Sequence, residues 1–257
     1  RFDWTERAIF CVPSWAWPEH ANASASDDAV LFCLNDLPVI KALGLYREEA
    51  LAENGAVLEF AIGTGRIALP LAARGLSVKG IEFSAAMVAQ LRKKEVGDPM
   101  EVVIGDMCSA RVAGTFSLVC LVFNTIDNLT TQDAQVACFE NAAAHLADGG
   151  RFVVETLLPP IQKIPFGETK RAFACDAAHL GIDTFDITTQ CYSSSHVWMD
   201  QGQHSYLSVP FRYVWPAEMD LMARIAGLTL EHRWSDWAKS PFTATSRSHI
   251  SVWRKPD

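Results

Sequence analysis

The sequence lacks the features that mark membrane and secreted proteins. Its 257 residues include no apolar run that approaches the ~20 residues needed to cross a bilayer, and no signal peptide is visible. The seven cysteines are odd in number and scattered, without a Cys-x-x-Cys pair. These absences predict a protein of the reduced cytoplasm, with neither a membrane partner nor a metal site.

Positive charge is also scarce. Lysine and arginine total 22 against 30 aspartate and glutamate residues, which gives a formal net charge of −8. The one dense basic group, Arg92-Lys93-Lys94, fits the solvent-exposed face of a helix. Because nucleic-acid binders carry basic patches, the composition argues against a nucleic-acid partner. A hydrophobic content of 49% suits one globular domain with room for an insertion.

The most informative stretch is the apolar segment from Val57 to Ile62, followed by Gly63-Thr64-Gly65. It predicts a buried strand, a tight turn and a helix over residues 65–74, which Pro70 is expected to bend. Glycine has no Cβ, so the backbone of such a turn accepts positive φ angles and lets a ligand lie against it. The unpaired N–H groups at the helix start favour an anion. This pattern alone is shared by enzymes that use nicotinamide, flavin or S-adenosylmethionine (SAM).

Three later motifs narrow the choice of cofactor. Glu82 ends a second predicted strand about twenty residues after the turn, where a carboxylate binds ribose hydroxyls. A third predicted strand ends in Gly105-Asp106-Met107, and a fourth ends in Phe123-Asn124. Since the carboxyl ends of parallel strands meet at one edge of a sheet, these motifs are expected to line one cleft.

Together these motifs resemble those of class I SAM-dependent methyltransferases, over residues 57–155. The segments Leu221–Leu228 and Pro241–Arg247 resemble the C-terminal region of small actinobacterial methyltransferases of secondary metabolism. Those of the cypemycin N-terminal methyltransferase type are similar, and amino-deoxysugar N-methyltransferases are more distant. The resemblance implies SAM as the cofactor, S-adenosylhomocysteine (SAH) as its product and a small-molecule acceptor.

Roles follow for the motif residues. The turn from Gly63 to Gly65 is expected to cradle the methionyl part of SAM, with Glu59 near the amino group. Glu82 is expected to accept hydrogen bonds from the ribose. Phe83 and Met87 are expected to flank the adenine, and Asp106 to accept from its amino group. The predicted cofactor-binding residues are Glu59, Ala61, Gly63, Thr64, Gly65, Arg66, Glu82, Phe83, Met87, Asp106, Met107 and Asn124.

The acceptor and any catalytic residue stay open. Methyl transfer from a sulfonium mainly requires alignment of the reactants and exclusion of water. An amine acceptor needs only to be unprotonated, whereas a hydroxyl needs a base within hydrogen-bond reach. The candidates for a base or an orienting group are Asn124, Glu155 and His204. The residues expected to bind the acceptor are Trp17, Asn128, Arg212, Tyr213 and Trp215.

The order of elements predicts an α/β fold. We expect a Rossmann-like, seven-stranded, mostly parallel sheet with helices on both faces, and an antiparallel β insertion over the active site. The insertion is expected to contain strands at Thr184–Tyr192, His196–Asp200 and His204–Trp215, with a hairpin turn at Gln201-Gly202. The predicted domains are an N-terminal helical lid (1–50), a SAM-binding core (51–159), the insertion as substrate cap or dimer contact (160–215), and a C-terminal helix with antiparallel edge strands (216–257).

The sequence therefore predicts a SAM-dependent methyltransferase (EC 2.1.1) that transfers a methyl group to a nitrogen or oxygen of a small molecule in secondary metabolism, with homodimerisation left open. One alternative is a nicotinamide-dependent oxidoreductase. The Gly105-Asp106-Met107 motif and the lack of a third phosphate-loop glycine argue against it. The other alternative is a SAM-binding regulator that has lost catalysis.

Overall fold

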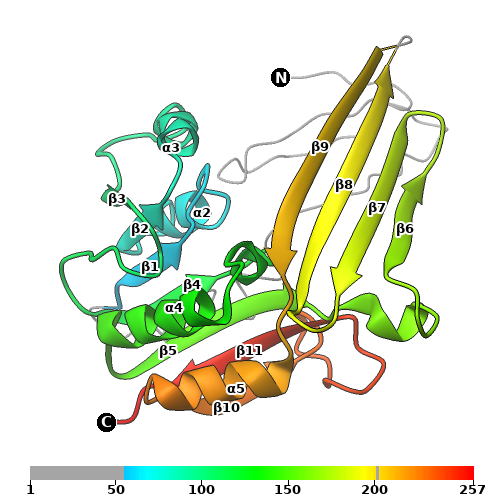
Figure 1. Cartoon of the computed structure of the whole chain (residues 1–257). Coiled ribbons are helices and arrows are strands. Elements are labelled where there is room, and N and C mark those ends of the chain that lie inside the picture. The colour runs from blue at the N-terminus through cyan, green and yellow to red at the C-terminus, as the bar shows by residue number, and fades with distance from the viewer. Residues whose placement is uncertain (1–54, 201–202) are drawn as a thin grey trace, which may run out of the picture.

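The computed structural model describes residues 55–200 and 203–257, and in this part the chain forms two β-sheets (Figure 1). Sheet A has seven strands in the order β10-β11-β5-β4-β1-β2-β3. Strand β11 runs antiparallel to both of its neighbours, and the other pairs are parallel. The predicted seven-stranded, mostly parallel sheet is thereby confirmed. Its strands are β1 (Val57–Phe60), β2 (Val78–Glu82), β3 (Val102–Ile104), β4 (Phe116–Leu121), β5 (Leu146–Leu157), β10 (Thr229–Trp234) and β11 (Ser248–Arg254).

Two hydrophobic cores cover the two faces of sheet A. Successive residues of a strand point to opposite faces, so Phe152 and Val154 join one core while Val153 joins the other. Helices α4 (Gln132–His145) and α5 (Pro216–Ile225) pack on the first face, where Figure 1 shows them side by side. Helices α2 (Ala68–Ala72) and α3 (Ala85–Arg92) contribute Leu71 and Leu91 to the second core.

The helix after the glycine turn is shorter than predicted. The expected helix at 65–74 is reduced to α2, which begins at Ala68. Pro70 has no N–H to donate to the carbonyl of Arg66, although the neighbouring N–H of Leu69 still bonds Gly65 O at 3.1 Å. Helix α2 ends at Ala72, and Gly75, which follows it, has a φ of +84° that glycine adopts readily.

Side-chain caps fix the starts of the next helices. Ser84 Oγ accepts from the N–H of Met87 at the start of α3, and Thr131 Oγ1 accepts from the N–H of Ala134 at the start of α4. Helix α4 has 14 residues, and none of the helices in the described part of the chain is long and apolar enough to cross a membrane. Strand β5 begins at Leu146, opposite Phe116, but its pairing with β4 is interrupted until Arg151, opposite Leu118, and Gly149 in this interruption has a φ of +70°.

Sheet B is an antiparallel meander that stands beyond the end of β5 (Figure 1). The strand expected at Thr184–Tyr192 is wrong: the chain turns between Asp186 and Cys191, where Gln190 has a φ of +60°. The pairing of Asp200 with Gln203 confirms the predicted hairpin, whose two turn residues lie outside the described part. The strands of sheet B are β6 (Lys170–Cys175), β7 (His179–Asp186), β8 (Cys191–Asp200) and β9 (Gln203–Arg212), and β6 follows the short 3-10 helix η2 (Pro160–Lys163).

One carboxylate ties sheet B to the core. Glu218, in the first turn of α5, accepts from Arg212 at 2.7 Å and from Gln190 at 2.7 Å. Gln132 of α4 donates to the same carboxylate at 2.7 Å. Burial would raise the pKa of Glu218, but the hydrogen bonds from these three side chains lower it below its usual value. The base of sheet B is therefore held to the core by hydrogen bonds and an ion pair to Glu218.

The predicted N-terminal lid and its helices (1–50) lie outside the described residues.

Candidate functional site

The glycine turn has an unusual backbone at the carboxyl end of β1. Ala61, Gly63 and Gly65 all have positive φ angles, of +52°, +56° and +79°. A left-handed alanine is strained, and strain of this kind persists at functional sites where surrounding structure enforces it. The N–H of Ile62 bonds Ile81 O at 3.1 Å and the N–H of Gly65 bonds Ile62 O at 2.9 Å, so both ends of the turn are fixed.

The two glycines of the turn serve different ends. A Cβ on Gly65 would lie 2.4 Å from Leu91 Cδ1 and 2.8 Å from Leu69 Cγ, so this glycine permits helix packing. A Cβ on Gly63 would meet nothing closer than Met87 Cε at 3.5 Å. Gly63 therefore offers backbone that a ligand can approach, which is what the sequence predicted for the turn.

Glu59 carries a buried polar atom without a partner. Its side chain is 3% exposed, and Oε2 has no hydrogen-bond partner in the described structure. Burial raises the pKa of Glu59 to about 8, opposed by a backbone hydrogen bond from Ala68, and nearby Glu82 adds to the rise. An unpaired acceptor beside the glycine turn fits a ligand that brings a donor, as the amino group of SAM would.

Glu82 bridges the turn and the start of α3. Its Oε2 accepts from the N–H of Gly63 at 2.8 Å, and its Oε1 accepts from the N–H of Ser84 at 2.9 Å. Each carboxylate oxygen keeps a second lone pair that can accept from a hydroxyl. The residue expected to hold the ribose is thus fixed directly beside the residues expected to hold the methionyl end.

The residues expected around the adenine lie at the same edge. Phe83 is 79% exposed. Met87 is 42% exposed, and its Cε would lie 3.5 Å from a Cβ on Gly63, so this side chain borders the glycine turn. Asp106 Oδ1 accepts from the N–H of Cys108 at 2.8 Å, and Asn141 donates to Met107 O at 2.8 Å. The backbone of the Asp-Met step is therefore held in place by its own loop and by α4.

The chain makes a sharp corner where β4 ends. Phe123 and Asn124 have φ angles of +58° and +59°, two successive left-handed residues without a glycine. The N–H of Phe123 donates to Glu155 Oε2 at 3.1 Å, and the N–H of Asn124 donates to Glu155 O at 3.2 Å. The guanidinium of Arg66, which follows the glycine turn, lies 4.6 Å from the centroid of the Phe123 ring. The structure thus brings Arg66, Asn124 and Glu155 together, as their positions in the sequence predicted.

A buried carboxylate follows this corner on the 3-10 helix η1 (Thr125–Asn128). Asp127 accepts from Thr156 Oγ1 and from the hydroxyl of Tyr192, each at 3.3 Å. Burial raises the pKa of Asp127 to about 7, although both hydrogen bonds lower it, as does Arg212. The link to Tyr192 spans 65 residues of sequence and carries no local motif, so the sequence had given no sign of it.

The predicted acceptor-binding residues do not form one group. Arg212 is 5% exposed and engaged by Gln135 and Glu218, so in the described structure it anchors sheet B, while its contact with the acceptor stays a prediction. The rings of Tyr213 and Trp215 contact each other with centroids 6.0 Å apart. Asn128 is exposed at the end of η1, and Trp17 lies outside the described residues.

His204, the third candidate for a base, is also displaced from the others. It lies one residue into β9, opposite Met199, at the hairpin end of sheet B that Figure 1 shows far from the core. There it lines a small hollow with Trp198 and Asp200. The structure therefore separates His204 from Asn124 and Glu155.

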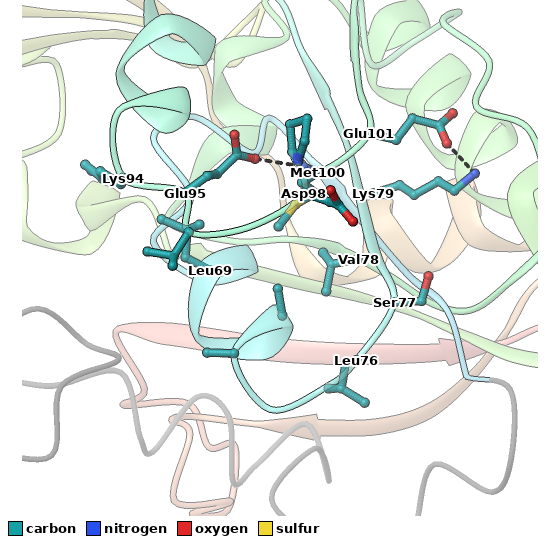
Figure 2. Close-up of a pocket in the computed structure, with 14 residues that line it drawn as sticks. Leu69, Leu76, Ser77, Val78, Lys79, Lys94, Glu95, Asp98, Met100 and Glu101 are labelled. Atoms are coloured by element: carbon teal, nitrogen blue, oxygen red, sulfur yellow. Dashed lines mark hydrogen bonds and ion pairs between the residues drawn. The ribbon is translucent and has the colours of Figure 1, made fainter.

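A hollow of about 680 Å³ lies between α2 and the segment 94–101 (Figure 2), and its lining residue Lys94 donates to Thr64 of the glycine turn, to Oγ1 at 2.8 Å and to the carbonyl oxygen at 3.2 Å. It is bordered by the beginnings of β2 and β3, not by their carboxyl ends. Two of its charged side chains are engaged with each other, as Lys79 and Glu101 form an ion pair at 2.6 Å. Ligands of such sheets bind at the carboxyl ends of the strands, so we place the candidate site at the glycine turn.

Comparisons with known proteins find relatives of this chain among methyltransferases. A methyltransferase domain family matches residues 57–150. The cypemycin N-terminal methyltransferase of a Streptomyces species is 28% identical over 207 residues, covering 78% of this chain and 83% of the relative. A dTDP-3-amino-3,6-dideoxy-alpha-D-glucopyranose N,N-dimethyltransferase of Streptomyces fradiae is 36% identical over 101 residues, covering 39% of this chain and 38% of the relative.

A solved structure extends the likeness to most of the chain. The CcbJ methyltransferase from Streptomyces caelestis is 34% identical, with a TM-score of 0.74, and the match covers 87% of this chain and 91% of that one. Other solved structures with this fold contain SAM. These matches argue against the alternative of a nicotinamide-dependent oxidoreductase, because they are to methyltransferases. Together with the strand order, the glycine turn and the acidic residue at the end of β2, they show that this chain belongs to the class I SAM-dependent methyltransferases.

Proposed function

We propose that this enzyme methylates an amino nitrogen of a small molecule of secondary metabolism. The observation that carries the proposal is the likeness to the cypemycin N-terminal methyltransferase over most of both chains. The shorter match to an amino-sugar N,N-dimethyltransferase, at 36% identity, supports the same acceptor atom. The site geometry fits nitrogen as well, because an amine needs no strong base.

In this proposal the cofactor lies along the carboxyl edge of sheet A. Gly63, Thr64 and Gly65 cradle the methionyl end, with Glu59 facing its amino group and Arg66 near its carboxylate. Glu82 accepts from the ribose hydroxyls through its free lone pairs. Phe83 and Met87 flank the adenine, and Asp106 accepts from its amino group with the backbone of Met107 beside it. The orphaned Oε2 of Glu59 and the open face of Gly63 support this placement.

The bound cofactor supplies a methyl group that is already activated on a sulfonium. What this chain has to provide is alignment and exclusion of water. Asn124, at the corner after β4, lies where an orienting amide can reach the reacting centre. Glu155 has both carboxylate oxygens engaged, by Phe123 N–H at 3.1 Å and by Trp237 Nε1–H at 2.8 Å, and this favours an acceptor that needs no base.

Sheet B forms the cap over the acceptor in this proposal. Tyr192 stacks with Phe185 and with Phe211, with ring centroids 5.1 Å apart in both pairs. Through Asp127 the Tyr192 hydroxyl reaches the loop beyond the β4 corner. An aromatic wall of this kind suits an acceptor with an apolar or cationic face. Tyr213, Trp215 and Asn128 border the same end of sheet B, and Arg212 acts as its anchor.

Two further parts of the proposal concern setting and assembly. We place the enzyme in the cytoplasm, since Cys108, Cys120, Cys138, Cys175 and Cys191 are all free thiols. Homodimerisation stays a prediction, to be checked by light scattering of the purified protein.

The test uses SAM with an isotopically labelled methyl group. The enzyme is incubated with a panel of matched small amines and alcohols, including amino sugars and the amino termini of short peptides. We expect labelled product from at least one amine and from none of the matched alcohols. Labelled product from alcohols alone would overturn the nitrogen assignment.

A further inference from the structure

The corner after β4 needs an explanation beyond its position at the site. Phe123 and Asn124 are both left-handed, at +58° and +59°. A residue with a Cβ adopts this conformation at a steric cost, which is small for asparagine and larger for phenylalanine, so the chain relaxes at Phe123 unless other contacts hold it. Phe123 is also a large apolar side chain that is 42% exposed at the same place.

Glu155 holds the corner from the neighbouring strand. Its side chain accepts from the N–H of Phe123 at 3.1 Å through Oε2, and its carbonyl accepts from the N–H of Asn124 at 3.2 Å. Both N–H groups that the bend exposes are therefore bonded to a single residue. Hydrogen bonds to a charged acceptor are stronger than neutral ones, so the Phe123 bond is the more valuable.

Trp237 fixes the carboxylate in turn. Its indole Nε1–H donates to Glu155 Oε1 at 2.8 Å, from a part of the chain 82 residues away. Indole nitrogen is a donor only and has no acid–base role near neutral pH. Trp237 thus orients the carboxylate through Oε1, while Oε2 accepts the hydrogen bond from the N–H of Phe123.

The corner joins three parts of the enzyme. The Phe123 ring lies against the guanidinium of Arg66, which comes from the glycine turn. Asn124 leads directly into η1, whose Asp127 bonds Tyr192 of sheet B. A shift of the corner would therefore move the cofactor side and the acceptor side relative to each other, and methyl transfer is sensitive to errors of this kind.

We propose that Glu155 and Trp237 are positioning residues that hold the left-handed Phe123–Asn124 corner in register for methyl transfer. Glu155 does this through Phe123 and does not take a proton from the acceptor. The inference rests on the proposed function, which places the corner beside the transferred methyl group. It also assigns a role to Trp237, for which no local sequence motif exists.

The test compares Glu155→Gln and Trp237→Phe. The first leaves one acceptor oxygen for two N–H donors, and the second removes the indole N–H while keeping a ring. Matched controls are Glu231→Gln, whose carboxylate pairs with Arg151 at 2.6 Å on the outer strands of sheet A, and Trp234→Phe, whose ring lies beside Lys239. All four variants and the wild type are measured by hydrogen exchange of peptides spanning residues 122–128, by SAH affinity, and by turnover of the amine that the labelling panel identifies.

We expect exchange at the corner to rise by about tenfold in both test variants, since one charged hydrogen bond is lost in each. Turnover should fall by about tenfold or more at every pH, while SAH affinity changes by less than about threefold. The double variant should be no worse than the more damaged single variant, because both act on one bond network. The controls should match the wild type.

Two outcomes would overturn the inference. Unchanged corner exchange and unchanged turnover in both test variants would show that the corner needs neither residue. Loss of turnover in Glu155→Gln alone, with normal exchange and normal Trp237→Phe activity, would show that Glu155 acts on the acceptor directly. Failure of the wild type to bind SAH is a different result, which would count against the proposed function itself.

Discussion

The two sheets of this enzyme are stabilised in opposite ways. The central strands of sheet A are buried on both faces, and residues such as Phe60, Val119 and Phe152 are no more than 1% exposed. Most of β9 in sheet B is exposed, and Arg212 at its base is the residue of that strand that becomes buried. Sheet A thus depends on continuous apolar packing, whereas sheet B depends on a few polar anchors at one end.

This difference fits a division of labour between cofactor and acceptor. The cofactor edge is built on the rigid sheet, where strand ends and two glycines set the geometry. Sheet B can vary in sequence over most of its area without disturbing that edge, provided that Arg212, Glu218, Asp127 and Tyr192 keep it attached.

The largest effect should come from breaking the charged anchor of sheet B. Arg212→Met leaves Glu218 partly buried without its ion pair, and we expect the free energy of unfolding to fall by about 3–5 kcal/mol. The matched control is Arg151→Met, which cuts the more exposed pair with Glu231 and should cost about 0–1 kcal/mol. Denaturant titration measures both, and equal losses would contradict the contrast between the anchor and surface pairs.

The two glycines of the turn should separate folding from binding. Gly65→Ala forces a Cβ against Leu91 at 2.4 Å, and we expect a loss of about 2–4 kcal/mol of stability from overpacking and strain. Gly63→Val also strains a backbone with a φ of +56°, but its Cβ meets no atom closer than Met87 Cε at 3.5 Å, so its loss of stability should be the smaller of the two. It fills the ligand side, so SAH affinity should fall by about a hundredfold, or about 2.7 kcal/mol. Calorimetry and thermal unfolding distinguish them. If Gly63→Val binds SAH normally, the cofactor does not lie on this turn.

Removal of the ribose carboxylate should have an intermediate effect. Glu82→Ala is expected to weaken SAH binding by about 1–3 kcal/mol through lost hydrogen bonds. Its control is Glu101→Ala, which breaks the Lys79 ion pair at the other edge of the sheet and should leave SAH affinity unchanged. Titration calorimetry reports both values. A loss in Glu101→Ala equal to that in Glu82→Ala would move the site to the hollow of Figure 2.

The smallest effect is the pH dependence of stability, which should differ between the carboxylates of Asp127 and Glu218 at the base of sheet B. Burial raises the pKa of Asp127 to about 7 from 3.8, so the folded state binds a proton that the unfolded state has released, and stability should fall as pH rises between these values. The pKa of Glu218 is lowered below 4.5, so its stabilisation is present above that pH and is lost on acidification. Each contribution is the difference in unfolding free energy between the wild type and Asp127→Asn or Glu218→Gln. Differences with the same pH slope would contradict these assignments.

The core and its site could be anticipated because their signals are local. A run such as Leu118 to Val122 alternates between the two cores, which identifies a buried strand without knowledge of its partners. Gly63 and Gly65 are required by the turn itself, and Glu82 follows at the spacing of one strand–helix–strand unit. The strand ends then had to meet, since all these strands are parallel.

Sheet B and its anchors could not be anticipated in the same way. Its strands alternate little in polarity, so the sequence pattern predicts a continuous strand where the chain in fact turns between Asp186 and Cys191. In the sequence, Arg212 stands among aromatic residues and is typical of a ligand pocket. Only its contacts with Glu218 and Gln135 in the structure show that it is an anchor of sheet B. Trp237 and Tyr192 donate hydrogen bonds to Glu155 and Asp127, which lie 82 and 65 residues away in the sequence. No periodic sequence pattern predicts contacts at such separations.

A structure of the protein crystallised with SAH tests the central claim most directly. We predict the nucleoside at the carboxyl edge of sheet A, with its ribose hydroxyls within hydrogen-bond distance of Glu82 and its amino-acid end on Gly63 to Gly65. Density for SAH between α2 and segment 94–101, or anywhere else while this edge stays empty, would contradict the account.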